Sequence, residues 1–271
     1  MKNNATSKNS ALIVSATASF VTPFMGSSIN VALPSIAKTF HINAVQLSWI
    51  AMAYLLSIGV SLVPMGRLAD IYGRKRIMAI GFILFTISSL FSALSWSVYS
   101  LIFFRIIQGV GNGMVFSTST AILASVFPPG ERGRVLGISV SAVYIGLSSG
   151  PFIGGILTLH LSWRSIFIAT FLLGFIVIWL IFLKLKGEWA EAKGERFDIL
   201  GSIIYGSSLI FLILGFSSLP HRRSIAFIAV SLSSFAAFMA WENKSKNPVF
   251  QTSLFLKNKA FSLSNLAALI H

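Results

Sequence analysis

Arg105 is the residue whose chemistry is hardest to explain as packing. It lies in LIFFRIIQGVGNG, residues 101–113, directly after a run (77–104) that holds no charged residue. A cation in apolar surroundings is costly and usually serves binding or ion coupling. Gln108 falls three residues on, on the same helical face, and would add polarity beside it. The alternative is an arginine near a helix end whose head reaches the polar surface.

A second stretch, GRLADIYGRKR at residues 66–76, concentrates four cations and one carboxylate between apolar runs. In such a loop Asp70 would be stabilised by a helix N-terminus. Arg74 and its two basic neighbours could pair with acids or with lipid phosphates. This pattern indicates a conformational latch. The alternative is a plain basic anchor at the inner membrane face with one incidental acid.

A third stretch, GLSSGPFIGG at residues 146–155, holds no charged residue, and its pattern concerns helix packing. Gly146, Gly150 and Gly154 recur every four residues and would form one flat stripe on a helix. Pro151 removes a hydrogen bond in mid-helix and favours a bend. The run predicts a helix pressed closely against another. Ordinary membrane packing would explain the glycines but not the Gly-Pro pair.

The elements that position these residues follow from composition. The 271 residues are 55% hydrophobic and 10% charged, whereas soluble domains carry about 25% charged residues. Because a spanning helix needs about 20 apolar residues, the sequence predicts an all-α polytopic membrane protein with eight complete spans and the start of a ninth near residue 260. The expected spans are 11–34, 48–66, 77–95, 98–122, 135–159, 164–185, 198–217 and 224–242.

The distribution of basic residues predicts how these spans are oriented. Sixteen of the 21 Lys and Arg residues fall in the N-terminus and alternate loops, four fall in the opposite loops, and Arg105 lies inside a span. Cytoplasmic loops carry the excess of such residues. The N-terminus and residues 66–76 are therefore expected in the cytoplasm. The net charge of +14 does not indicate nucleic-acid binding, because the cations lie in short loops between apolar runs.

Several motifs together resemble those of the major facilitator superfamily. The loop pattern G-x-L-A-D-r-x-G-r-k is matched by Gly66, Leu68, Asp70, Gly73, Arg74 and Lys75. The pattern R-x-x-q-G-x-g is similar to the stretch from Arg105, and g-x-x-x-G-P-x-x-G-G is similar to the run that ends in Gly154 and Gly155. Further matches at 30–34, 163–167, 198–201 and 248–262 resemble its fourteen-span drug:proton antiporters of the QacA/EmrB type.

This resemblance implies a fold and a function. The expected parts are a six-helix bundle (1–185), a cytoplasmic linker (186–197), an inserted helix pair (198–242), and a loop with the start of a second bundle (243–271). The implied function is proton-driven efflux of small amphipathic or cationic molecules across the cell membrane by alternating access. Arg105 would serve ion coupling or cavity polarity, and Gln108 and Asn30 would line the cavity.

The resemblance further assigns two groups of structural residues. The residues at 66–76 would set the equilibrium between the inward-facing and outward-facing states at the cytoplasmic face. Those at 146–155 would shape the antiporter helix. No cofactor is expected, because the sequence has no P-loop and no two His with metal-ligand spacing. No Ser/His/Asp set lies at one depth, so an enzyme is not expected.

One position departs from the antiporter pattern. The first-helix signature has an acidic residue five positions before its asparagine, but Met25 stands there while Asn30 is kept. No Asp or Glu falls well inside the first six spans, and an arginine does not release its proton. Either a carboxylate outside residues 1–271 carries the proton, or coupling differs from that of the family, or it has been lost.

The expected second bundle is absent from this sequence, and alternating access needs two bundles around a shared site. One interpretation is a transporter whose C-terminal bundle, or its equivalent, is a missing partner. The alternative is a truncated, non-transporting membrane remnant or interaction subunit. The lipid bilayer, a small-molecule substrate and protons are the other expected partners. The substrate itself is not indicated by the sequence.

Overall fold

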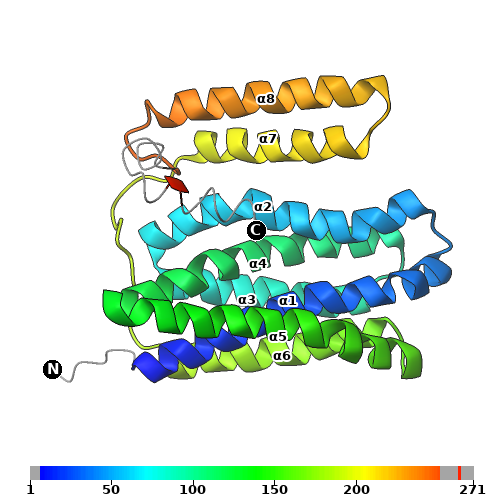
Figure 1. Ribbon diagram of the computed structural model, residues 1–271, viewed down its shortest axis with the longest axis horizontal. Coiled ribbons are helices and arrows are strands. Elements are labelled where there is room, and N and C mark those ends of the chain that lie inside the picture. Colours follow the sequence, from blue (N-terminus) through cyan, green and yellow to red (C-terminus); the bar gives the residue numbers. More distant parts are fainter. Residues whose placement is uncertain (1–6, 251–261, 264–271) are drawn as a thin grey trace. The chain divides into compact units, whose positions relative to one another are not determined.

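The computed structural model describes residues 7–250 and 262–263, and every regular element there is an α-helix. The helices are α1 (Lys8–Phe40), α2 (Ala44–Tyr72), α3 (Arg74–Ala93), α4 (Val98–Val126), α5 (Pro129–His160), α6 (Arg164–Lys184), α7 (Ile199–Ser217) and α8 (Arg222–Glu242) (Figure 1). All eight are long and apolar enough to cross a membrane, which confirms the eight complete spans. The ninth predicted span and most of the 248–262 motif lie outside the described residues.

Side-chain caps explain where several helices begin. Asn43 and Gln46 form a reciprocal capping box at the start of α2. Ser97 and Ser100 do the same for α4. Asp198 caps α7 by accepting a hydrogen bond from Gly201 N at 2.8 Å. Each cap satisfies amide groups that have no partner within the helix, so these three spans begin with part of their polar backbone paired.

The expected loop at 66–76 was wrong in one respect. α2 continues to Tyr72, and α3 begins at Arg74, so that Gly73 alone separates the two helices. The backbone φ of Gly73 is 112°, which residues other than glycine rarely adopt. An apolar-run criterion stops at the first charged residue, whereas a helix continues through charged residues once it leaves the membrane. Most of the motif is therefore helical.

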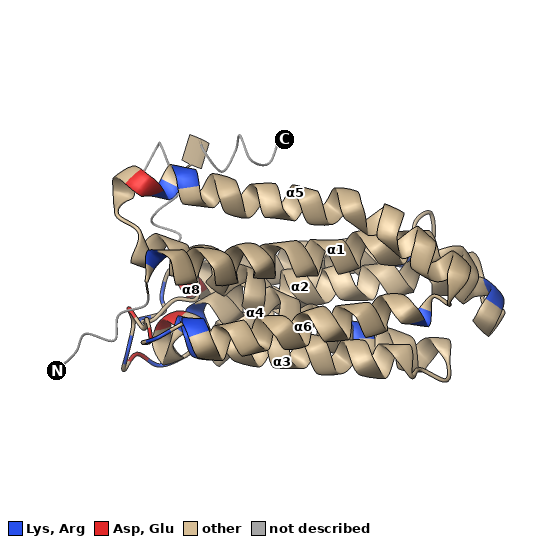
Figure 2. Ribbon diagram, turned by 90° about the horizontal axis from the view of Figure 1, so that it is seen from below, with Lys and Arg blue, Asp and Glu red and all other residues tan. Residues whose placement is uncertain are grey.

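The chain divides into two compact units, Met1–Lys193 and Gly194–His271. In the first unit, the most extensive helix contacts join α1 to α5, α2 to α4, and α3 to α4 and α6. Its core is apolar and rich in aromatic side chains, and Phe82, Phe85 and Phe167 are fully buried there. Figure 2 shows these helices running alongside one another. The second unit is a hairpin of α7 and α8, in which Ser231 Oγ donates to Ser208 O at 2.8 Å.

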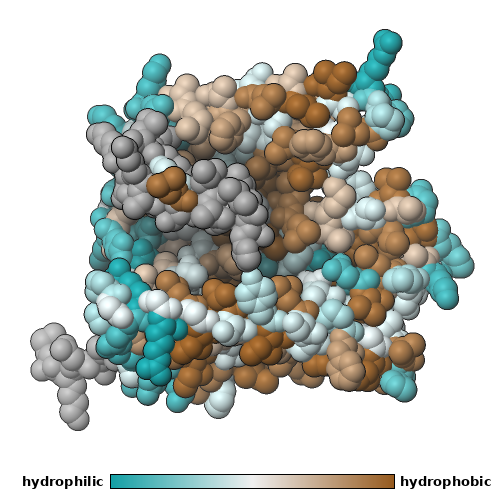
Figure 3. Space-filling view, viewed as in Figure 1, coloured by the Kyte–Doolittle hydropathy of each residue, from teal (hydrophilic) through white to brown (hydrophobic). Residues whose placement is uncertain are grey.

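Apolar side chains cover much of the outer surface of the helices. Phe152 is 73% exposed and Trp179 is 61% exposed. In Figure 3, brown apolar residues follow the lengths of the helices, and teal polar residues gather at their ends. A soluble monomer rarely exposes contiguous apolar surface of this extent, whereas lipid would solvate it. The eight apolar helices and this surface are those of an integral membrane protein.

Candidate functional site

Arg105 lies inside the first unit, with its side chain almost fully buried at 1% exposure. Its Nη1 donates to Gln108 Oε1 at 2.7 Å and to Met25 Sδ at 3.0 Å. Its Nε donates to Ile50 O at 3.2 Å. The guanidinium carbon lies 3.8 Å from the ring centroid of Tyr54. The arginine therefore does not reach the polar surface, and its charge faces neutral dipoles and an aromatic ring.

The carboxylates of the first unit lie near helix ends or in the segment after α6, not beside this cation. All seven Asp and Glu residues fall within the described residues. They occupy helix ends or the segment between α6 and α7, at Asp70, Glu131, Glu188, Glu191, Glu195, Asp198 and Glu242. In Figure 2 the red segments of the first unit gather at one end of its helices. Within the described residues no acid pairs with Arg105.

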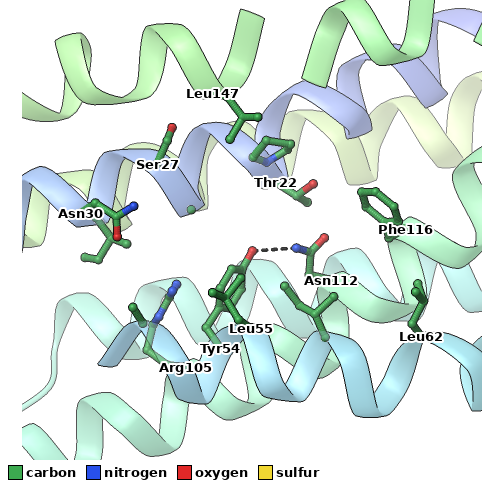
Figure 4. A pocket seen from close by; sticks show the side chains of 15 residues that line it. Thr22, Ser27, Asn30, Tyr54, Leu55, Leu62, Arg105, Asn112, Phe116 and Leu147 are labelled. Atoms are coloured by element: carbon green, nitrogen blue, oxygen red, sulfur yellow. Dashed lines mark hydrogen bonds between the residues drawn. The ribbon is translucent and has the colours of Figure 1, made fainter. Parts of the chain in front are cut away.

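A cavity of about 360 Å³ opens beside Arg105, with walls from α1, α2, α4 and α5. Arg105 and Asn30 both line it, and Figure 4 shows the guanidinium directed toward α1, the helix that carries Asn30. Apolar side chains such as Leu55, Phe116 and Leu147 form much of the remaining wall. Concave, mostly apolar sites with a few polar groups are typical ligand sites.

Gln108 does not line this cavity, contrary to the prediction. It is fully buried behind Arg105, and its Nε2 donates to Ser89 Oγ at 2.6 Å. The Gln108 amide thus links the Arg105 guanidinium to Ser89 of α3. The i+3 spacing correctly placed the two residues on one face, but spacing alone does not show which of them faces the hollow.

Two cavity residues were not singled out from the sequence. Asn112 Nδ2 donates to Tyr54 Oη at 2.7 Å (Figure 4), and its Oδ1 is buried without a hydrogen-bond partner among the described residues. Asn112 follows Arg105 by seven residues, two helical turns along the same face, and that spacing was a usable signal. Nothing local in the sequence marks Tyr54.

The glycine stripe of α5 packs against α1. A methyl group on Gly150 would lie 2.7 Å from Phe24 O, and one on Gly154 would lie 3.0 Å from Ser28 O. Ser28 Oγ in turn donates to Gly150 O at 2.9 Å. This confirms the predicted close approach of two helices. Gly155 is different, because a methyl group there would lie 3.7 Å from its nearest neighbour, Val31.

The 66–76 motif is organised around Arg74, which is 7% exposed. Its Nη2 and Nε donate to Asp70 Oδ1 at 2.7 and 2.9 Å. Its Nη1 donates to Glu191 Oε1 at 2.7 Å and also to Ser125 Oγ. The same guanidinium thus joins the ends of α2 and α4 to the segment that follows α6. Lys75 is drawn to this segment too, where its Nζ donates to Leu185 O.

The segment after α6 also seals the break between α2 and α3. Glu188 accepts hydrogen bonds from Lys75 N at 2.7 Å and Arg76 N at 3.1 Å, and so caps α3. Trp189 O accepts from Arg74 N at 2.8 Å. Part of the predicted linker (186–197) thus supplies partners of the motif within the first unit.

Gly66 and Leu68 of the same motif lie in packing contacts. Gly66 lies on α2 opposite α4, where a methyl group would lie 3.5 Å from Ser117 Cβ, an ordinary contact. Leu68 is partly buried against a small apolar cluster that includes Ala69 and Met114. Neither residue contacts the charged group around Arg74 in a hydrogen bond. The site roles of these motifs stay predictions.

Comparison with known proteins identifies relatives of this chain. It is 32% identical over 255 residues to the riboflavin transporter RibZ of Clostridioides difficile, covering 94% of this chain and 56% of that protein. It is 34% identical over 266 residues to the cephamycin export protein CmcT of Amycolatopsis lactamdurans, covering 94% and 55%. It is 27% identical over 232 residues to the tetracenomycin C resistance and export protein of Streptomyces glaucescens, covering 84% and 43%.

The chain thus spans about half the length of these curated relatives. The model of the Major Facilitator Superfamily matches residues 15–270. That match includes the cavity, the glycine stripe and the motif around Arg74. With its all-helical bundle, the chain belongs to the Major Facilitator Superfamily.

Proposed function

We propose that this protein is a secondary active transporter that exports small amphipathic molecules by alternating access. The observation that carries the proposal is the apolar cavity between α1, α2, α4 and α5, with the buried Arg105 and Asn112 on its wall. A mostly apolar hollow with a few fixed polar groups suits amphipathic ligands. Two relatives named as export proteins support the direction of transport.

In this proposal the chain supplies one bundle and a helix pair, and further sequence supplies the second bundle. Transporters of this kind bind their substrate near the midplane, between two repeats that rock against each other. The cavity beside Arg105 would be half of that site. The charged group around Arg74, Asp70 and Glu191 would bias the two states from the ends of the helices.

Protons are the proposed coupling ion, as the resemblance of residues 146–155 to the antiporter helix implies. A proton carrier must gain and lose charge, and Arg105 cannot serve. Because every carboxylate of this chain lies at a helix end or between helices, the carrier would come from outside residues 1–271. Membership in the fourteen-span drug:proton antiporter branch belongs to the same proposal.

The test is efflux of a panel of fluorescent dyes from cells that express the complete reading frame, with and without a protonophore. Dye export that the protonophore abolishes would support the proposal. Correct membrane insertion without gradient-dependent export of any dye would contradict it. The second candidate, a non-transporting membrane remnant or interaction subunit, would then be favoured.

The cytoplasmic placement of the N-terminus is a further part of the proposal. The chain has no cysteine, so single cysteines can be introduced without altering a native background. Lys8→Cys lies at the start of α1, and Trp96→Cys lies in the connection before α4, where the side chain is 76% exposed. In intact cells an impermeant maleimide should label only the second variant. Labelling of the first variant alone would reverse the orientation.

A further inference from the structure

The groups around the buried Arg105 offset only part of its positive charge. Its Nε and Nη1 have the acceptors described above, of which the Met25 thioether is a weak one. No described atom accepts a hydrogen bond from Nη2, which carries two N–H groups. The π-face of Tyr54 offsets part of the charge. What remains is a cation with unused donors on the wall of an apolar cavity.

Met25 determines this imbalance. Its sulfur lies 3.0 Å from Arg105 Nη1, a distance at which a carboxylate would form an ion pair. Here the thioether adds no negative charge, and the described lining of the cavity contains no acid. The site therefore has one cation and no anion, the arrangement that disfavours a cationic ligand by like-charge repulsion.

Asn112 is a second cavity residue with an unpaired polar group. Its Oδ1 is buried without a hydrogen-bond partner in the described structure, and the residue is 5% exposed. A buried acceptor left unpaired is costly, so a ligand that brings a donor would gain there. Because the two residues are seven apart on α4, the two polar groups are separated by about 10 Å along the helix axis.

We propose that this cavity selects molecules that carry a carboxylate or similar anionic group on an apolar body, with a hydrogen-bond donor about 10 Å away. The anionic group binds Arg105 Nη2, the apolar body fills the space against Leu55 and Phe116, and the donor pairs with Asn112 Oδ1. This proposal rests on the proposed transport function and names its substrate class. It also replaces the cationic substrates that the family resemblance implied.

The experiment compares three probes that share one fluorophore and differ in charge. Dansylglycine carries a carboxylate, dansylamide is neutral, and dansylcadaverine carries an ammonium group. Binding to the purified full chain in lipid nanodiscs is measured by dansyl fluorescence, which does not require transport. Because hydrogen bonds to charged groups contribute more than neutral ones, dansylglycine should bind roughly 10-fold or more tightly than dansylcadaverine.

Substitutions at Met25 test whether the charge balance causes this preference. Met25→Glu places a carboxylate against Arg105 and should reduce the ratio of the two affinities by roughly 10-fold. Met25→Gln is the matched neutral variant and should keep dansylglycine as the preferred probe. Leu94→Glu adds the same charge at the exposed end of α3 and should not change the ratio.

The outcomes separate this proposal from the transport function. A preference for dansylglycine that Met25→Glu removes supports the proposal, even if cells show no efflux and the transport function fails. Dye efflux together with equal or tighter binding of dansylcadaverine overturns the proposal alone. A preference that survives Met25→Glu, or binding of no probe, also overturns it.

Discussion

Replacing Gly150 by alanine tests how closely α5 packs on α1. The added methyl would lie 2.7 Å from Phe24 O, below the 3.4 Å at which ordinary contact begins. That oxygen is backbone and cannot rotate away, so the two helices must shift. Overpacking of this kind costs about 1–3 kcal/mol, and the better helix propensity of alanine returns about 0.5–1 kcal/mol.

The net expectation for Gly150→Ala is a loss of about 1 kcal/mol, with extremes of about 0 and 2.5 kcal/mol, or a fall of about 2–4 °C in the unfolding midpoint. Gly155→Ala is the matched control five residues along the same helix. Its methyl would meet only Val31, at 3.7 Å, so the midpoint should stay constant or rise slightly. Intrinsic tryptophan fluorescence during heating, in one detergent for both variants, measures the difference.

Equal midpoints for the two variants would refute this reasoning. A fall for Gly155→Ala as large as that for Gly150→Ala would refute it as well, because the two positions would then respond to a general property of α5. The comparison depends on the difference between variants, and so it does not require reversible unfolding.

Three further predictions concern transport by the complete protein. Arg105→Ala should reduce dye efflux at least about 10-fold while the protein still inserts, since a charged hydrogen-bond donor contributes about 1.5–3 kcal/mol. Normal efflux by this variant would show that Arg105 is not needed for transport. Asp70→Asn should change the maximal rate several-fold and leave the half-saturating concentration nearly constant, because it weakens the Arg74 group at the helix ends and not the cavity; an unchanged rate would favour a simple anchor. Replacing each of the seven Asp and Glu residues by its amide, one at a time, should leave the dependence on the pH gradient intact; loss of that dependence in any variant would place the proton carrier in this chain.

Much of the fold could be predicted because its signals are local. Uncharged runs long enough to span a bilayer gave eight helices, and the helical period placed the Gly150 and Gly154 stripe on one face. The cost of burying a charge singled out Arg105. The end of α2 was placed too early because the run criterion stopped at Gly66, although nothing there breaks a helix before Gly73.

The contacts that define the site were harder to predict because they join residues far apart in the chain. Met25 was noted as an unusual residue, yet no pattern shows that its sulfur touches Arg105. Likewise Glu188 and Glu191 look like ordinary linker charges until the fold brings them to α3. Cytoplasmic orientation rests on the count of basic residues and stays a prediction.

The distribution of glycines has a consequence for motion. A methyl group on Gly111 of α4 would lie 2.7 Å from Gly81 O of α3, and one on Gly113 would lie 2.8 Å from Ser61 Cβ of α2. These contacts fasten α2, α3 and α4 together, whereas Gly150 belongs to the separate pair of α1 and α5. The cavity lies along the seam between these two blocks, where direct contact of α1 with α2 and of α4 with α5 is sparse, although α1 also contacts α4 through Ser15 and Ser119. Widening that seam would enlarge the cavity without disturbing any of these glycine contacts, so the bundle can be rigid within each block and compliant at the cavity.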